Sequence, residues 1–339
     1  MQLNEIWFLV VGFLFIGYFV LDGFDFGVGM ALPFLGKDDT DRRVLINTIG
    51  PVWDLNETWV LVAGASLFAA FPEWYASLFS GFYLPLLLIL AALIVRGVAF
   101  EYRGKGHTIG ADEAKWKSRF DWMIVIGSAL PALLWGVAFA NIVQGVPLNK
   151  DHVYTGTLFT LLNPYGLLGG LVTLTLFFTH GLVFITLKTE GEIKDRARAL
   201  ATKVGIITTV LAAVFLVWTL IAHFSVLGFI LTALAALSLI AALVANHFKR
   251  EGISFSLLVF TIITAVGSLF AALFPNVLPS STDPAFSLTI ENASSSQYTL
   301  TVMSWVAVVM IPLVLLYQGW TYWVFRKRVS RKSIPAGSH

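Results

Sequence analysis

Four acidic side chains lie inside two segments of the sequence that are otherwise apolar. Asp22 and Asp25 occur in LDGFDFGVG, and Asp54 and Glu57 occur in GPVWDLNETW. A charge at membrane depth costs about 3 kcal/mol or more, so it is retained mainly where it faces a protein interior or a water path. The i,i+3 spacing places each pair on one helix face. Such a set of carboxyl groups is suited to binding and releasing protons.

The composition predicts that these acids are carried by an all-α integral membrane protein. Of the 339 residues, 57% are hydrophobic and 12% are charged, whereas soluble domains carry about 25% charged residues. A helix needs about 20 apolar residues to cross a bilayer. Residues 1–330 are expected to form one polytopic domain, and residues 331–339 a disordered tail. Nine segments qualify as transmembrane helices: 6–32, 51–71, 75–97, 121–143, 165–187, 204–224, 226–247, 254–275 and 298–325.

The basic residues predict the orientation of these nine helices. With the N-terminus outside, 21 of the 22 Lys and Arg residues fall on the cytoplasmic side, and only Lys150 lies outside. This asymmetry is a strong positive-inside signal. We therefore expect an outer N-terminus and a cytoplasmic C-terminus. The basic residues that follow the last helix, from Arg326 to Lys332, are then expected to contact anionic lipid at the inner face.

This orientation places all four acids near the cytoplasmic side, at a depth similar to that of Arg96. One interpretation is a proton-loading cluster that opens to the cytoplasm, and we favour it for Asp25 and Asp54, which are expected deeper in apolar surroundings. The other is a structural ion-pair network or a helix cap, which we favour for Asp22 and Glu57. At Asp54 the helix dipole favours the ionised form and burial favours the neutral form, which suits a group that exchanges protons.

The chain offers few groups that could bind a redox cofactor. It has no cysteine, so disulfides, thiolate metal sites and iron–sulfur ligation are excluded. Only His180 lies in the middle of a predicted helix, and no two histidines share a helix face. We therefore expect no metal site and no directly bound haem. The G-x-G in GFDFGVG follows no strand, so a nucleotide-binding loop is not expected, nor is a nucleic-acid partner.

Several longer motifs carry a family resemblance. DGFDFGVG followed by RRVLINTIGPVWDLNETWV resembles the signature of subunit II of cytochrome bd-type quinol oxidases. Other stretches agree and extend the resemblance over nearly the whole chain: FAAFPEWYASLFSGFY, RGVAFEYR, FANIVQGVP, LLNPYGLLGG, FPNVLPSSTDP and SSSQYTLTVMSWVAVVMIPLVLLYQGW. The combination is highly specific, although no single stretch would be.

The resemblance implies a fold and a complex. The fold is nine helices arranged as two four-helix bundles plus one peripheral helix. The partner is a subunit I that holds the b- and d-type haems and the quinol site. The complex sits in the bacterial cytoplasmic membrane, oxidises quinol and reduces dioxygen to water without pumping protons. A structural quinone in this chain, an oxygen route through it and a small single-helix subunit are left open.

The resemblance also implies roles for individual residues. Asp25 and Asp54 match acidic positions of the family, and Asp54 is the best candidate for a proton-entry residue. Trp53 and Arg96 match positions that support the subunit contact or the acid network. Glu57 stands where some relatives have Gln, so it adds an ionisable group beside Asp54.

Two other functions are compatible with buried acids. A proton-coupled transporter also carries acids among its helices, but transporters commonly show internal repeats, and we find none in this sequence. A scaffold would use its acids only for assembly. Co-purification with a haem-bearing partner would favour the oxidase subunit over both.

Overall fold

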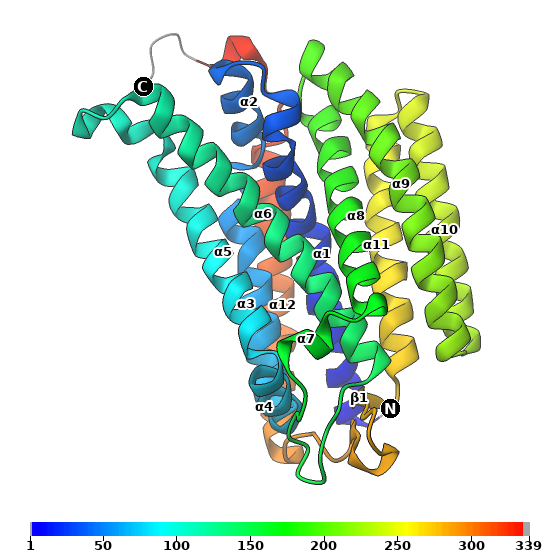
Figure 1. Ribbon diagram of the computed structural model, residues 1–339. Coiled ribbons are helices and arrows are strands. Elements are labelled where there is room, and N and C mark those ends of the chain that lie inside the picture. The colour runs from blue at the N-terminus through cyan, green and yellow to red at the C-terminus, as the bar shows by residue number, and fades with distance from the viewer. Residues whose placement is uncertain (1, 335–339) are drawn as a thin grey trace.

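The computed structural model describes residues 2–334, and nearly all of them lie in helices that run roughly parallel or antiparallel (Figure 1). Both segments that contain the acids are helical. The longer helices are, in chain order, α1 (Leu3–Leu35), α2 (Asp39–Ile49), α3 (Trp53–Ala70), α4 (Pro72–Gly81), α5 (Tyr83–Tyr102), α6 (Glu113–Gln144), α8 (Pro164–Lys188), α9 (Glu192–Ala222), α10 (Val226–His247), α11 (Glu251–Leu273) and α12 (Gln297–Val324). The shorter ones are η1 (Arg103–Ile109), α7 (Leu158–Leu161), η2 (Pro284–Phe286) and η3 (Arg331–Ser333).

Within the described residues, eight helices are long and apolar enough to cross a membrane. They correspond to eight of the nine predicted segments. The remaining segment, 51–71, is the 18-residue helix α3, which is not among the eight. Its first turns contain Asp54, Asn56 and Glu57, and these polar residues lower its mean hydropathy. The multi-pass membrane architecture is therefore supported, while the count of nine depends on α3.

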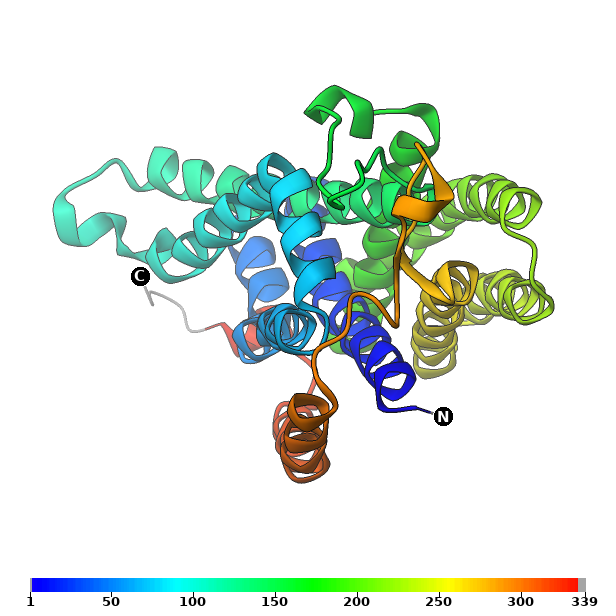
Figure 2. The ribbon, with the colours of Figure 1, turned by 90° about the horizontal axis from the view of Figure 1, so that it is seen from below.

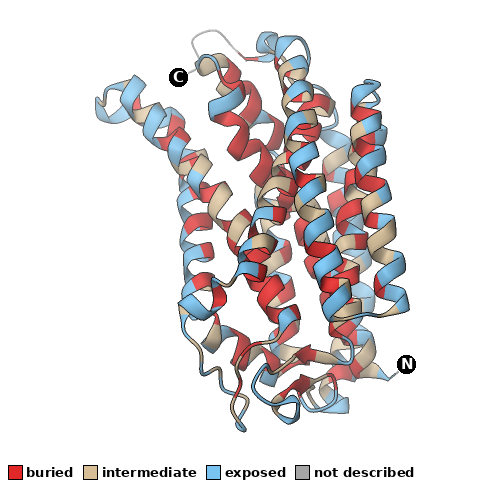
Figure 3. Cartoon of the chain, turned by 45° about the vertical axis from the view of Figure 1, so that its right-hand side comes forward, coloured by how far each residue is buried: buried red, intermediate tan, exposed pale blue. Residues whose placement is uncertain are grey.

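The helices form two groups and one outlier. In the first group α3 and α6 pack on α1, and α5 packs on α6; α8, α9, α10 and α11 form the second group. The groups meet where α8 packs against α1 and α6. Helix α12 touches only α1 and α3 appreciably, and the view from below shows it standing apart (Figure 2). Figure 3 shows buried residues on the inward faces and exposed residues along the outer faces.

The close approach of the two groups depends on glycine. A Cβ built on Gly27 of α1 would lie 2.1 Å from the carbonyl oxygen of Phe177 and 2.7 Å from the Cα of Gly181, both on α8. A Cβ built on Gly181 would lie 2.4 Å from the backbone of Gly27. Small residues permit such contacts between helix backbones in membranes. The two helices therefore touch directly at this level.

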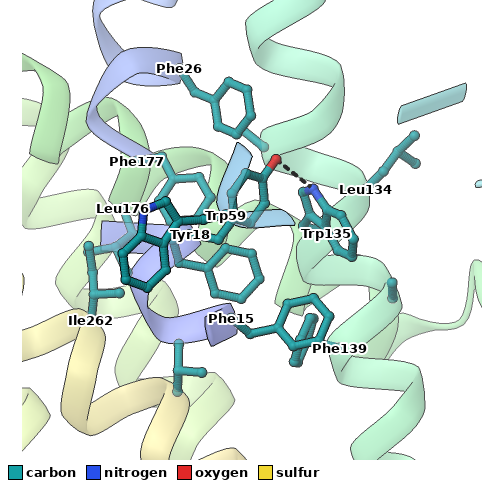
Figure 4. Close-up of a cluster of buried hydrophobic side chains, with 14 of the residues drawn as sticks. Phe15, Tyr18, Phe26, Trp59, Leu134, Trp135, Phe139, Leu176, Phe177 and Ile262 are labelled. Carbon is teal, nitrogen blue, oxygen red and sulfur yellow. Dashed lines mark hydrogen bonds between the residues drawn. The ribbon is translucent and has the colours of Figure 1, made fainter. Parts of the chain in front are cut away.

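An aromatic core fills the centre beside this crossing (Figure 4). Tyr18 of α1 and Trp135 of α6 point toward each other, and Trp135 Nε1 donates to the Tyr18 hydroxyl at 3.2 Å. Phe15 and Phe139 pack edge to face with ring centroids 5.1 Å apart. Edge-to-face aromatic pairs add about 0.5–1.5 kcal/mol beyond their buried area. This core fixes α1 against α6, next to the acids of α1.

Two segments differ from the predicted elements. The charged stretch between the first two predicted helices, where no helix was predicted, is the helix α2, and its N-cap Asp38 accepts a hydrogen bond from the Asp41 amide at 2.8 Å. The third predicted segment, 75–97, is divided at Phe82 into α4 and α5. The segment also begins earlier than predicted, because Pro72 is the first residue of α4.

The two longer loops, 145–163 between α6 and α8 and 274–296 between α11 and α12, are ordered and lie against each other. One carries α7, and the other carries η2 and the two-stranded antiparallel sheet of β1 (Asn276–Leu278) and β2 (Leu288–Thr289). The loops are joined by a bridge between Val146 and Ser280. This pairing satisfies backbone groups that would otherwise be exposed at the ends of the helices.

The chain after α12 folds back onto the opposite end of the molecule. Val329 forms a bridge with Thr189, and Arg331 Nη2 pairs with Asp38 Oδ2 at 2.8 Å. The hydrogen bond from Arg331 lowers the pKa of Asp38 from its ordinary value. The prediction of a disordered tail over 331–339 is therefore wrong for 331–334, because Arg331 also reaches Asp41. Residues 335–339 lie outside the described residues.

Candidate functional site

A buried group of three carboxyl side chains and one guanidinium lies where α1, α3 and α5 meet. Asp22 and Asp25 come from α1, Glu57 from α3 and Arg96 from α5. Asp22, Asp25 and Arg96 are each 0% exposed, and the Glu57 side chain is 20% exposed. We call these four residues the acidic cluster. Their convergence agrees with the similar depth predicted from the sequence.

Arg96 is the centre of the acidic cluster. Its Nη1 lies 3.1 Å from Asp22 Oδ1 and 3.6 Å from Glu57 Oε2. The guanidinium also lies over the Phe26 ring, 4.7 Å from its centroid. A Cβ built on Gly127 of α6 would approach the Arg96 Cβ to 2.7 Å, so the glycine leaves room for the arginine stem. A planar guanidinium held by two acids and an aromatic face is well suited to burial.

Asp25 is bound differently from Asp22. Its Oδ2 accepts a hydrogen bond of 2.7 Å from Asn56 Nδ2. The Asn56 carbonyl oxygen accepts in turn from Gln318 Nε2 at 3.0 Å and from the Tyr322 hydroxyl at 2.7 Å. These two donors on one oxygen fix which way the amide faces. Helix α12, which makes few other contacts, therefore orients the Asn56 side chain that donates to Asp25.

The same polar chain continues to a tryptophan of α3. Trp59 Nε1 donates to Gln318 Oε1 at 2.7 Å. The Trp59 ring lies against Gly17 of α1, where a Cβ would come within 2.1 Å of the ring. Buried polar groups are costly unless hydrogen-bonded. The contacts through Gln318 therefore attach α12 to the bundle at the level of the acidic cluster.

Several polar atoms of the acidic cluster have no hydrogen-bond partner within residues 2–334. They are Asp22 Oδ2, Asp25 Oδ1, Glu57 Oε2, Arg96 Nε and Arg96 Nη2. A carboxyl oxygen with spare capacity can bind a proton or a water molecule. The cluster holds three carboxyl groups and one guanidinium, so it is electrically neutral only when two of the three carboxyl groups carry protons. The arrangement is chemically suited to exchanging protons.

Asp54 lies in a different environment from the other acids. The expectation that it is buried in apolar surroundings is wrong for this chain, because Asp54 is exposed on α3. Its neighbour Trp53 is half-buried and packs on Phe100 of α5 at 5.2 Å between ring centroids. A helix turn separates Asp54 from Glu57, which faces the cluster. The structure thus places Asp54 outside the cluster and Glu57 at its edge.

His180 is the one histidine predicted in the middle of a helix, and its ring packs against aromatic side chains. Its ring stacks on Phe255 at 4.8 Å and meets Phe24 edge to face at 5.8 Å. Its Nε2 lies 3.1 Å from the carbonyl oxygen of Val20. One face of the ring and its Nε2 are therefore engaged by protein groups, while Nδ1 has no hydrogen-bond partner within residues 2–334. The contacts are those of a packed core histidine.

Among the described residues, no group of three or more His, Cys, Asp or Glu side chains is placed to hold a metal ion. A separate apolar cavity of about 220 Å³ lies between the two helix groups, and it is lined by residues that include Phe19, Trp135, Phe177, Phe215, Leu239 and Ile262. A cavity with such walls can accept an apolar chain but not an ion.

Sequence reasoning missed the residues that surround Asp25. Asn56 lies between Asp54 and Glu57 in the sequence, and Gln318 is a polar residue within a strongly apolar segment. A buried polar group in a membrane helix is itself a signal of a partner. That signal could have identified both residues. It could not have paired them, because they are 262 positions apart.

Comparisons with known proteins agree with one another. The family model described as "Cytochrome bd terminal oxidase subunit II" matches residues 3–325. The chain is 44% identical over 338 residues to "Cytochrome bd ubiquinol oxidase subunit 2" of Bacillus subtilis (strain 168), covering 98% of each protein. It is 40% identical over 375 residues to "Cytochrome bd-I ubiquinol oxidase subunit 2" of Escherichia coli (strain K12), covering 99% of this chain and 98% of that protein.

A solved structure shares the fold. A chain from "The structure of bd oxidase from Geobacillus thermodenitrificans" superposes with a TM-score of 0.77 at 18% identity, over 96% of this chain and 100% of that one. The family model and the two relatives indicate the same family, and the fold agrees with it. The chain belongs to the cytochrome bd terminal oxidase subunit II family.

Proposed function

We propose that this chain is the subunit of a quinol-oxidising, dioxygen-reducing complex that carries no haem itself. A haem-bearing subunit I, with b- and d-type haems, is then its partner. Family membership supports a place in a respiratory oxidoreductase. The packing of His180 between Phe255 and Phe24 supports the absence of a haem ligand in this chain. The family also favours this role over a proton-coupled transporter.

We further propose that the acidic cluster takes up protons from the cytoplasm for oxygen reduction. The observation that carries this proposal is the close placement of two buried carboxyl groups, Asp22 and Asp25, and the partly exposed Glu57 near the single guanidinium of Arg96. A cluster of that kind can gain or lose a proton with little structural change. Asp54 would receive protons at the surface, and Glu57, one turn further along α3, would pass them to Asp22 and Asp25.

The exposure of Asp54 supports a position facing subunit I. Asp54, Leu61 and Phe68 are spaced seven residues apart, so they lie on one face of α3. All three are exposed, with Leu61 at 65% and Phe68 at 59%. An exposed apolar stripe that includes an acid is costly in lipid, and a partner subunit would cover it. Asp54 would then lie between the two chains rather than in the bilayer.

The apolar cavity between the helix groups supports a bound structural quinone, since an isoprenoid tail needs an apolar lining such as Phe19 and Phe177 provide. Solvent extraction of the purified complex tests this, with more than one quinone per complex expected if this chain holds one. Oxygen passage through the chain and a small single-helix subunit belong to the same proposal, but no residue of the described chain is assigned to either.

The experiment that tests the proton route is Asp54→Asn in the purified complex with its haems. Quinol-driven oxygen consumption should fall while the visible haem spectrum and subunit content stay as in the native complex. Glu101→Gln is the matched control, because Glu101 is an exposed acid on α5 and lies outside the cluster. Native turnover in assembled Asp54→Asn complex would remove Asp54 from the route.

The complex itself is tested by purification through this chain. Co-purification of a haem-bearing polypeptide, and loss of quinol-driven oxygen consumption when this chain is deleted, are the expected results. Isolation of the chain alone and without pigment from membranes that still oxidise quinol would contradict the proposal.

A further inference from the structure

A cavity of about 650 Å³ opens at the end of the helix bundle where the basic residues gather. It lies between the C-terminal ends of α8 and α12 and the segment that joins α2 to α3. Its walls include Lys188 of α8, and Arg326, Lys327 and Arg328 beyond α12. The acidic cluster and the cavity between the helix groups are both elsewhere in the fold. We call it the basic cavity.

The basic cavity carries positive charge without acidic partners. None of the residues described along its walls is Asp or Glu. Lys188 Nζ donates to the carbonyl oxygen of Lys327 at 3.2 Å, and Arg328 Nε donates to the carbonyl oxygen of Leu187 at 3.2 Å. Arg326 Nη1 donates to the carbonyl oxygen of Trp323 at 2.6 Å. These bonds to neutral carbonyl groups orient the cations but leave their charge uncompensated.

A neighbouring group of basic residues, in contrast, is paired with acidic side chains. Arg196 Nη2 lies 2.7 Å from Asp41 Oδ2, and Arg331 Nη1 lies 2.5 Å from Asp41 Oδ1. Those cations are neutralised within the chain. The cations of the basic cavity, in contrast, form no ion pair within residues 2–334. Uncompensated cations held around one cavity create a site for an anion.

The opposite wall of the basic cavity is apolar. It is formed by Phe184, Phe255 and Val324, which belong to helices long and apolar enough to cross the membrane. The cavity therefore joins a basic rim to apolar side chains in the end turns of these helices. A small soluble anion would match only the rim, whereas a phospholipid would match both parts.

We propose that the basic cavity binds the headgroup of an anionic phospholipid, with its phosphate near Arg326, Lys327 and Arg328 and an acyl chain against Phe184 and Phe255. Each basic residue near an anionic surface strengthens lipid binding. From the contribution expected per residue, the loss of two of them should weaken lipid binding about thirtyfold. The site does not depend on the proton route through the acidic cluster.

The test uses native mass spectrometry of the purified complex in detergent. Phosphatidylglycerol, phosphatidylethanolamine and inorganic phosphate are added separately to the native complex and to Arg326→Gln/Lys327→Gln. We expect the native complex to bind phosphatidylglycerol more tightly than phosphatidylethanolamine. We expect the double variant to bind phosphatidylglycerol about thirtyfold more weakly than the native complex does. The matched control is Arg119→Gln/Lys203→Gln, which removes two exposed cations that do not line the cavity and should leave binding unchanged.

Each other outcome overturns the proposal. Equal binding of the two phospholipids would show that charge does not select the ligand. Displacement of phosphatidylglycerol by inorganic phosphate at similar concentration would identify a soluble-anion site. Equal loss in the control variant would indicate a general surface effect. The haem spectrum and the oxygen consumption of each variant report folding separately, so a failure of the site is distinguishable from a failure of the complex.

Should Arg326→Gln/Lys327→Gln not assemble, Lys327→Gln alone provides the second variant. The side chain of Lys327 is exposed, and its backbone carbonyl, which accepts from Lys188, is unchanged by the substitution. We expect an intermediate loss of phosphatidylglycerol affinity, about fivefold for one charge. Full retention of affinity in an assembled Lys327→Gln complex would contradict the site.

Discussion

Replacement of Arg96 by methionine is the most informative perturbation of the acidic cluster. Methionine is close to the arginine stem in length and apolar, so the substitution removes the charge and keeps most of the packing against Phe26. At an effective dielectric constant of about 20, a guanidinium 3.1 Å from a carboxylate gains about 5 kcal/mol of Coulomb energy before desolvation. Breaking a buried pair by removing one partner costs about 3–5 kcal/mol.

We therefore expect Arg96→Met to lower the free energy of unfolding by about 3–5 kcal/mol. The double variant Asp22→Asn/Arg96→Met should recover about 2 kcal/mol of that loss, because it removes one of the stranded carboxylates. Titration of the purified complex with sodium dodecyl sulfate, followed by tryptophan fluorescence, measures both. Arg119→Met is the control, since Arg119 is exposed on α6.

Two results would contradict the expected loss of stability in Arg96→Met and its partial recovery in the double variant. Native stability in Arg96→Met would mean that the guanidinium is not what stabilises the buried carboxyl groups. Strict additivity of the two substitutions would mean that Asp22 and Arg96 do not interact, despite their separation of 3.1 Å.

Two further predictions concern the helix crossing and the C-terminal contact. Gly27→Ala should destabilise the chain strongly, because the new Cβ would lie 2.1 Å from a backbone oxygen of Phe177. Gly64→Ala is the control and should be neutral, because a Cβ there has open space. Thermal unfolding of the two variants measures the difference in stability. The pKa of Asp38 is lowered by the hydrogen bond from Arg331, so this bond stabilises the fold above the ordinary pKa of 3.8 and its contribution is lost as the pH falls through the lowered value. The difference in Tm between the native complex and Arg331→Gln should be constant well above the ordinary pKa and shrink as the pH falls through the lowered pKa of Asp38. A difference independent of pH would contradict it.

The sequence predicted what depends on local pattern. Each transmembrane segment is a long apolar run, and apolar length alone decides whether a helix can span a bilayer. The convergence of Asp22, Glu57 and Arg96 also followed from the sequence, because the basic residues oriented the helices and so placed these side chains at one depth. The family resemblance was confirmed by the family model.

The sequence did not predict which face of α3 each acid occupies. Asp54 and Glu57 are three residues apart and share a broad face, yet Asp54 is exposed and Glu57 touches Arg96. A rotation of α3 by a fraction of a turn decides between these environments, and that rotation is set by Trp59 packing on Gly17. Such contacts between helices are not encoded in the spacing of one segment.

The polar contacts of α12 were unpredictable for a related reason. Gln318 and Tyr322 meet Asn56 across 262 and 266 positions, and no local pattern links segments so far apart. The division of the third segment at Phe82 also has no proline or glycine at the break itself, although Gly81 precedes it. The charged stretch that forms α2 was too short and too polar to match a membrane helix.

The most direct test of the central claim is the turnover of assembled complex that carries Asp25→Asn. Asparagine keeps the size of Asp25 and its contact with Asn56 but cannot exchange a proton. We expect an unchanged haem spectrum and quinol-driven oxygen consumption reduced about a hundredfold, the lower range for loss of a positioned proton-transfer group. Native oxygen consumption in the fully assembled variant would contradict it, and loss of the haems would assign Asp25 to structure instead.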